Sequence, residues 1–254
     1  STQAKTLFPY TTLFRSTGAV NVELGRILFK GATNTTWNQF ASGFTLDAAS
    51  GNAVVELQPD NQGTSGLFTT DITGTMTLGG GGAAPFLRLY QADAFSNMTI
   101  SGPVVLKANA TIHNSGAAAN QQVNVISGVI SENGGSFGLS INGDTAWGST
   151  NYQVLRLDAA NTFTGPLSLA AGTVEFTTVT NAGGAASNLG QGSSINLGGT
   201  LRFVGSLAQS TDRPITLTAG STLNASGSGG ATITYSGAIT GGGSGLTLDG
   251  NGEG

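Results

Sequence analysis

Residues 161–176 read NTFTGPLSLAAGTVEF, and this stretch contains the two features that decide the fold. In its runs PLSL and TVEF, apolar and polar residues alternate, which places Leu, Val and Phe on one face of a strand and Ser, Thr and Glu on the other. Gly165 lies before the first run and Gly172 before the second, and glycine tolerates the positive φ angles of tight turns. The stretch therefore predicts two short strands, each preceded by a glycine-containing turn.

The same pattern continues along the chain from Thr17 onward. Short alternating runs are separated by clusters of Gly, Asn, Ser and Asp, and no window shows the 3.6-residue apolar stripe of a helix. We therefore expect an all-β protein. The alternating runs include RILFK (26–30), FTLDA (44–48), VVELQ (54–58), GTMTLG (74–79), FLRLY (86–90), VLRLD (154–158), GTLRFV (199–204) and TITYS (232–236).

Internal repetition separates a solenoid from a sandwich or a barrel. The run from Leu87, LRLYQADAFSNMTISGPVVL, is similar to the run from Leu155, LRLDAANTFTGPLSLAAGTV. A second element, an SGxI turn followed by Gly-rich residues and an LxL run, occurs from Val125 and from Thr234, with a degraded copy from Thr70. These repeat-like elements cover about residues 70–125, 126–235 and 236–254.

Stacked coils explain this repetition, because one coil cannot bury its apolar face without neighbouring coils as partners. We expect a right-handed parallel β-helix, or β-solenoid, with coils of roughly 20–25 residues and about ten coils in all. Only 9% of the residues are charged, which fits this fold because like charges stacked at the strand spacing would repel each other. We also expect the chain to be a fragment of a longer solenoid without its end caps.

The beginning of the chain differs from the rest. The segment KTLFPYTTLFRSTG (5–18) contains Lys5, Arg15 and three aromatic residues, and it has no glycine before Gly18. Its residues 6–16, TLFPYTTLFRS, resemble the translation of a common short-read sequencing adapter. We therefore interpret residues 1–16 as an artefact and residues 17–254 as the solenoid repeat region.

Composition restricts the classes of function. The chain has no cysteine, so a disulfide framework and a zinc–thiolate site are both excluded. Its net charge is −4 without clusters of Lys and Arg, which argues against nucleic acid as a partner. No apolar run approaches the roughly 20 residues of a transmembrane helix. We expect no cofactor.

Residues 161–176 resemble the autotransporter-associated β-strand repeat, and the similarity extends over most of residues 70–254. The first copy departs from the family pattern with DAFSN (93–97), and Pro166 stands where a second glycine is usual. The resemblance implies a parallel β-helical stalk or passenger segment in a large exported bacterial protein. The residues that match the family's turn and its Gly-Thr step are Asn161, Thr162, Phe163, Thr164, Gly165, Gly172 and Thr173.

We therefore predict a structural or adhesive segment, not an enzyme, at the bacterial cell surface, with host or environmental glycans or surfaces as potential partners. The alternative is a polysaccharide-binding or polysaccharide-degrading β-helix. Degradation needs converging carboxylates, or carboxylates with Arg or Lys, whereas the 13 acidic residues are scattered singly. Four aromatic residues could form a sugar platform, although we expect them to fill or cap coils: Trp37, Trp147, Tyr152 and Tyr235.

Two further features are candidates for chemistry. His113 is the only histidine, and in the context TIHNSG we expect an exposed turn residue, not a catalytic one. Asp47, Asp158 and Asp249 each follow a short alternating run. In a common register they would form a carboxylate column able to hold calcium, while the alternative is that each aspartate starts a turn through its own backbone.

Overall fold

The computed structural model describes residues 20–22, 25–30, 35–39, 44–46, 54–60, 68–80, 84–91, 96–116, 123–142 and 151–251. These residues form strands and turns, and no helix is found among them. Consequently, no helix in the described ranges is long and apolar enough to cross a membrane. The prediction of an all-β protein is confirmed. Residues 1–16, which we interpret as an artefact, lie outside the described residues.

The described strands form three long parallel sheets and one short one. Five strands form sheet A: β1 (Val20–Val22), β4 (Phe44–Leu46), β7 (Met76–Leu78), β10 (Val104–Leu106) and β13 (Ile130–Glu132). Nine form sheet B: β2 (Gly25–Lys30), β5 (Val54–Asp60), β8 (Phe86–Gln91), β11 (Ala110–Gly116), β14 (Leu139–Ile141), β16 (Leu167–Leu169), β18 (Ile195–Leu197), β21 (Ile215–Leu217) and β24 (Ile239–Thr240).

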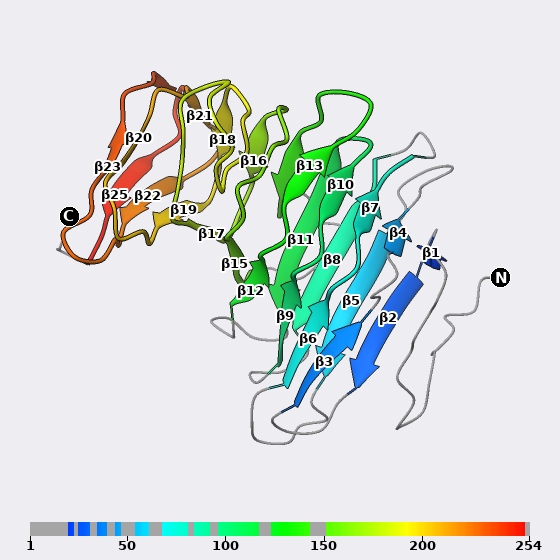
Figure 1. Cartoon of the computed structure of the whole chain (residues 1–254). Coiled ribbons are helices and arrows are strands. Elements are labelled where there is room, and N and C mark those ends of the chain that lie inside the picture. Colours follow the sequence, from blue (N-terminus) through cyan, green and yellow to red (C-terminus); the bar gives the residue numbers. More distant parts are fainter. Residues whose placement is uncertain are drawn as a thin grey trace.

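Nine further strands form sheet C: β3 (Thr35–Gln39), β6 (Phe68–Ile72), β9 (Ser96–Ile100), β12 (Asn124–Ile126), β15 (Val154–Leu157), β17 (Thr173–Phe176), β19 (Thr200–Phe203), β22 (Ser221–Ala225) and β25 (Leu246–Asp249). The short sheet pairs β20 (Gln209–Thr211) with β23 (Ile233–Tyr235). Up to β15 the chain visits sheets A, B and C in turn and then returns to sheet A one strand further along, whereas after β15 its strands join sheets B and C and the short β20–β23 sheet (Figure 1). This is the predicted β-solenoid of stacked parallel coils.

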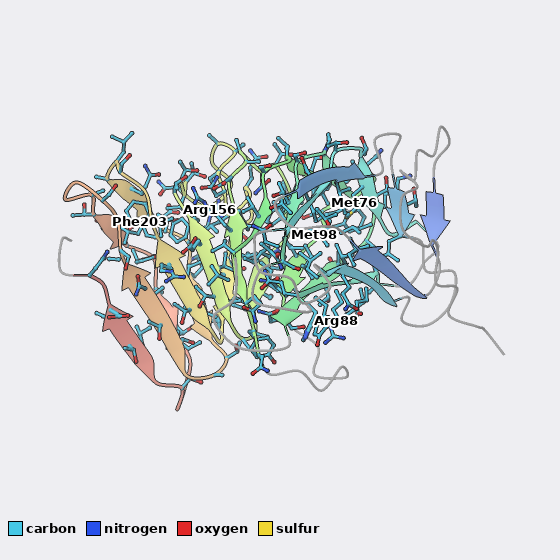
Figure 2. The ribbon with its side chains drawn as sticks, turned by 90° about the horizontal axis from the view of Figure 1, so that it is seen from below. Met76, Arg88, Met98, Arg156 and Phe203 are labelled. Atoms are coloured by element: carbon cyan, nitrogen blue, oxygen red, sulfur yellow. The ribbon has the colours of Figure 1, made fainter. Side chains whose placement is uncertain are left out.

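The core lies between the sheets and is continuous along the stack. In sheet B, the inward-facing residues Leu139, Leu167 and Ile195 occupy equivalent positions in consecutive strands and are at most 1% exposed. Figure 2 shows side chains filling the interior along its length, with Met76, Met98 and Phe203 among them. Each fully buried aliphatic side chain contributes about 1.5–3 kcal/mol relative to an exposed one, so stacking supplies most of the stabilisation.

The coils are less regular than the sequence predicts. Register partners in adjacent coils are 25 residues apart at Asn224 and Asp249 but 32 apart at Glu56 and Arg88. The sequence similarity between the runs from Leu87 and Leu155 does not reflect stacking, since Leu87 lies in sheet B and Leu155 in sheet C. Similar alternating runs can occupy either sheet, because both sheets bury one face against the same core.

A column of glycines explains the SGxI turns between sheets C and A. A Cβ atom on Gly128 would lie 1.8 Å from the carbonyl oxygen of Gly102. A Cβ atom on Gly102 would in turn lie 2.1 Å from the carbonyl oxygen of Gly74. The backbones of three consecutive coils thus approach too closely for any side chain at this corner.

Candidate functional site

Three charged or titratable residues form a column on the outer face of sheet B. Glu56, Arg88 and His113 occupy equivalent positions in β5, β8 and β11. Their neighbours Leu57 and Leu89 belong to the core, so strand alternation directs the three side chains away from it. The three residues are nevertheless buried, at 1%, 6% and 0% exposure. This buried column is the most unusual chemical feature of the described residues.

Arg88 pairs with Glu56 in this column and also contacts Ser115 and Tyr90. Its Nη1 donates a hydrogen bond to Glu56 Oε2 at 2.5 Å, and its Nε donates to Ser115 Oγ at 3.3 Å. Its guanidinium also lies 4.3 Å from the ring centroid of Tyr90, a cation–π contact. Because a buried ion pair is retained only when both partners are well satisfied, these contacts hold Arg88 in one position.

The prediction that His113 is an exposed turn residue is wrong. His113 lies within β11, which continues to Gly116, and its ring is stacked on Phe86 with centroids 5.9 Å apart. Tyr152 also packs edge-on against the imidazole, with ring centroids 5.7 Å apart. Tyr152 reaches this position because it forms an antiparallel bridge with Ser115 on the rim of the sheet. The local sequence around His113 could not reveal that Tyr152 buries it, because Tyr152 comes from the next coil.

A buried amide network adjoins the column, where β11 and β12 approach each other. Asn124 donates from Nδ2 to Asn114 Oδ1 at 2.6 Å and accepts from Gln91 Nε2 at 2.9 Å. Asn114 donates to the carbonyl oxygen of Gln153 at 3.0 Å, and its backbone N–H donates to Asn142 Oδ1 at 2.7 Å. These residues follow no motif spacing, so no local sequence pattern identifies them. Satisfied buried amides of this kind specify how neighbouring coils fit together.

The three aspartates do not form the hypothetical calcium column. Asp249 is in register with Asn224, and that column continues through Arg202 and Glu175 to Arg156. Asp158 lies two positions beyond Arg156 and therefore in a different column. Asp47 lies outside the described residues, although β4, which precedes it, belongs to sheet A and not to sheet C. Within the described ranges, no group of three or more His, Asp or Glu residues could hold a metal ion.

In the column that does form on the outer face of sheet C, no two like charges are adjacent, and the neutral Asn224 lies between Arg202 and Asp249. Glu175 accepts from Arg202 at 3.0 Å, and Asp249 accepts from Asn224 at 2.8 Å. Arg156 instead pairs with Asp158, which follows its strand, with Nε and Oδ1 2.7 Å apart. These partly exposed pairs contribute about 0–1 kcal/mol each. Their main effect is to avoid stacking like charges at adjacent positions.

The turn at residues 161–165 lies at a coil corner, where its side chains pack against neighbouring coils. Asn161 is fully buried: its Oδ1 accepts from the backbone N–H of Ile130 at 2.7 Å, and its Nδ2 donates to the carbonyl oxygen of Asn188 at 2.6 Å. It thereby joins the coil before it to the coil after it. Phe163 fills the core at 0% exposure. A Cβ atom on Gly165 would lie 2.2 Å from the backbone of Phe137.

The remaining residues of this segment make further hydrogen bonds between coils or shape the backbone. Thr164 donates from Oγ1 to Glu132 Oε1 at 2.6 Å and from its backbone N–H to Glu132 Oε2 at 3.1 Å, and Thr162 N–H donates to the carbonyl oxygen of Ile130 at 2.9 Å. Gly172 has a φ of +73°, which favours glycine, and Thr173 begins β17. Partial burial would raise the pKa of Glu132, but its hydrogen bonds from Phe137 and Thr164 together lower it below the ordinary value.

The aromatic residues do not gather into a sugar platform in the part of the chain that the structure describes. Tyr152 packs on His113, whereas Tyr235 lies in β23 and packs against the core. Burial raises the pKa of the Tyr235 phenol above its ordinary value. Trp37 lies in β3, in register with Thr70, and Trp147 lies outside the described residues.

The charged and titratable side chains described above are thus buried in contacts between coils or paired on the surface. The Glu56–Arg88–His113 column is too enclosed for a polymeric substrate to reach. Searches against protein families, curated proteins and solved structures find no family model, no curated protein and no solved structure that matches this chain.

Proposed function

We propose that this chain is a structural, rod-forming segment of an exported bacterial surface protein, which holds or presents an adhesive surface at a distance from the cell. The observation that carries the proposal is the unbroken stacking of sheets B and C, each with nine strands in the described part. A rod of this kind gains stability from every added coil and needs no catalytic site. Its length grows by about 4.8 Å per coil.

The placement of polar side chains supports a mechanical role. Asn161, Glu132 and Arg88 each join one coil to the next through hydrogen bonds or an ion pair. Such contacts resist shear between coils in addition to the backbone ladders. The export and cell-surface parts of the proposal rest on the resemblance of residues 161–176 to the autotransporter-associated repeat. Glycans or host surfaces would then be the partners of the exposed outer faces.

Single-molecule pulling on the purified chain tests the mechanical role. We expect unfolding in several force steps, each releasing about one to a few coils, because contacts in a solenoid are confined to neighbours. In the Asn161→Ala variant, the first unfolding step should occur at a lower force than in the unchanged chain. Ser193→Ala changes an exposed residue outside the strands and should leave this force unchanged. One featureless low-force extension would contradict the proposal.

A parallel screen distinguishes the alternative functions. The chain is incubated with a panel of polysaccharides and assayed for binding, for new reducing ends and for unsaturated products. A stalk predicts no products, and any glycan binding should survive substitution of the buried His113. Product formation that is lost with His113→Ala while the fold is retained would instead support a polysaccharide-degrading enzyme.

A further inference from the structure

Two asparagines of Asn-Gly sequences lie in opposite environments within neighbouring corners. Asn133 follows β13 in an exposed bend, and the next residue, Gly134, has a φ of +96° with no other atom within 4 Å of where a Cβ would lie. Asn142 follows β14, is 2% exposed and has a φ of +56°. The same dipeptide is thus open to solvent at one corner and begins inside the coil at the other.

Hydrogen bonds reinforce this contrast. Asn142 Oδ1 accepts from the backbone N–H of Asn114 at 2.7 Å, and its Nδ2 donates to the carbonyl oxygen of Ala171 at 2.9 Å. Both ends of its amide are therefore held by neighbouring coils. The side-chain amide of Asn133 has no hydrogen bond to any described residue, and only the backbone N–H of Asn133 is fixed, by the carbonyl oxygen of Leu106 at 2.9 Å.

We propose that Asn133 is a site of spontaneous covalent modification, deamidation through a succinimide, and that the fold protects Asn142 from the same reaction. The backbone nitrogen of Gly134 attacks Cγ of Asn133, forming a C–N bond while the Cγ–Nδ2 bond breaks. The proton of the Gly134 N–H goes to the leaving amide nitrogen, which departs as ammonia. Water then opens the ring at either carbonyl, giving aspartate or isoaspartate, and no oxidant or enzyme is needed.

The environment decides the rate because the two reacting atoms must approach each other by rotation of the backbone and of the side chain. Glycine offers no side chain to obstruct the attacking nitrogen, and the exposed bend at residues 133–135 leaves room for this rotation. At Asn142 the same movement requires breaking two hydrogen bonds and opening the corner locally. The protected asparagine is therefore an internal reference for the reactive one.

Modification at Asn133 would alter a corner that braces two coils. The new carboxylate would lie next to Glu132, which accepts hydrogen bonds from Thr164 in the following coil. Like charges at adjacent positions disfavour the ionised form of Glu132 and so weaken these hydrogen bonds. Isoaspartate also lengthens the backbone between the Asn133 N–H and Gly134. Ageing of the molecule should thus loosen this corner first.

Peptide mapping by mass spectrometry tests the inference on the full chain. Samples are aged at mildly alkaline pH, one folded and one in concentrated urea, and the amide-to-carboxyl conversion at each asparagine is followed with separation of aspartate and isoaspartate peptides. In the folded sample we expect Asn133 to convert about tenfold or more faster than Asn142, since the latter must first lose two hydrogen bonds. In urea the two rates should be similar.

Two variants complete the design. Asn133→Ser should abolish the conversion in its peptide while leaving the Asn142 peptide unchanged. The Asn133→Asp variant should have the same free energy of unfolding as the aspartate form of the aged chain. Equal rates at Asn133 and Asn142 in the folded sample would overturn the proposal. The proposal would also be overturned if Asn133 stayed unmodified in the folded protein after the urea sample had reacted to completion.

Discussion

The coils up to β15 differ from the coils after it in the number of long sheets that their strands join. In the first region each coil contributes a strand to all three sheets, and sheet A ends with β13. In the second region only sheets B and C continue, and the third side is formed by the corner at Asn161, by the segment 177–192 and by the pair β20–β23. Two stacked sheets are therefore sufficient for this solenoid, and the third side varies.

The outward-facing side chains of sheet B also differ between the two regions. In the first region it carries the buried Glu56–Arg88–His113 column, with Tyr152 packed on it. In the second region the outward positions are Ser168, Asn196 and Thr216, which are half-buried to exposed. An outer face that is covered must satisfy its polar groups internally, while an open one leaves them to water. Four predictions test this comparison.

The largest effect should come from the glycine corner of the first region. Gly128→Ala places a Cβ 1.8 Å from a backbone oxygen, so we expect a loss of about 4 kcal/mol or more, or failure to fold. Gly220→Ala is the matched control, because nothing lies within 4 Å of its added Cβ and its φ is not positive. Urea denaturation measures both. Similar stabilities for the two variants would show that the glycine column is not required.

Breaking the covered ion pair should have the next largest effect. Glu56→Ala leaves the buried Arg88 without its carboxylate and should lower the free energy of unfolding by about 3 kcal/mol. The double change Glu56→Leu with Arg88→Met should recover most of this loss, because it removes both charges of this pair together. In the second region, Arg202→Ala removes only a partly exposed pair and should change stability by less than about 1 kcal/mol. Equal losses at both sites would remove the distinction between the two regions.

Arg213 should anchor the corner segment of the second region. It is 1% exposed and donates to the carbonyl oxygens of Leu189 at 2.9 Å and Gly190 at 2.7 Å, and burial lowers the pKa of its guanidinium. Arg213→Ala should cost about 2 kcal/mol and increase proteolytic cleavage between residues 180 and 192. The far-UV circular dichroism spectrum should stay unchanged. Cleavage elsewhere, with this segment intact, would contradict the anchoring role.

The smallest effect concerns pH at the corner that joins the two regions. Since the fold lowers the pKa of Glu132, its contribution is present above the ordinary value of 4.5 and is lost as pH falls through the lower pKa of the folded state. Glu132→Gln should reduce stability by about 1 kcal/mol at neutral pH and remove this part of the acid dependence. Stability curves of the two proteins should converge at low pH. If the two stability curves stay parallel at all pH values, Glu132 does not cause this part of the acid dependence.

Much of the fold could be read from local sequence, and much of the candidate site could not. The runs at 167–169 and 173–176 alternate strictly, so their strands and buried faces are predictable from strand geometry alone. His113 shows the limit of local prediction. Its strand continues through Asn114, Ser115 and Gly116, residues typical of a turn, because β8 of the preceding coil pairs with it and Tyr152 of the next coil packs on it. Tertiary pairing there overrides local propensity.

By itself, the sequence determined the all-β class, the stacking of coils and the glycine turns, because alternation and backbone space are local properties that repeat with each coil. Only the tertiary structure decided which residues share a column. Asp158 and Asp249 are separated in register, while Glu56, Arg88 and His113 share one column although they come from three consecutive coils. Register depends on the length of every intervening loop, and these lengths vary from coil to coil, so no local pattern encodes it.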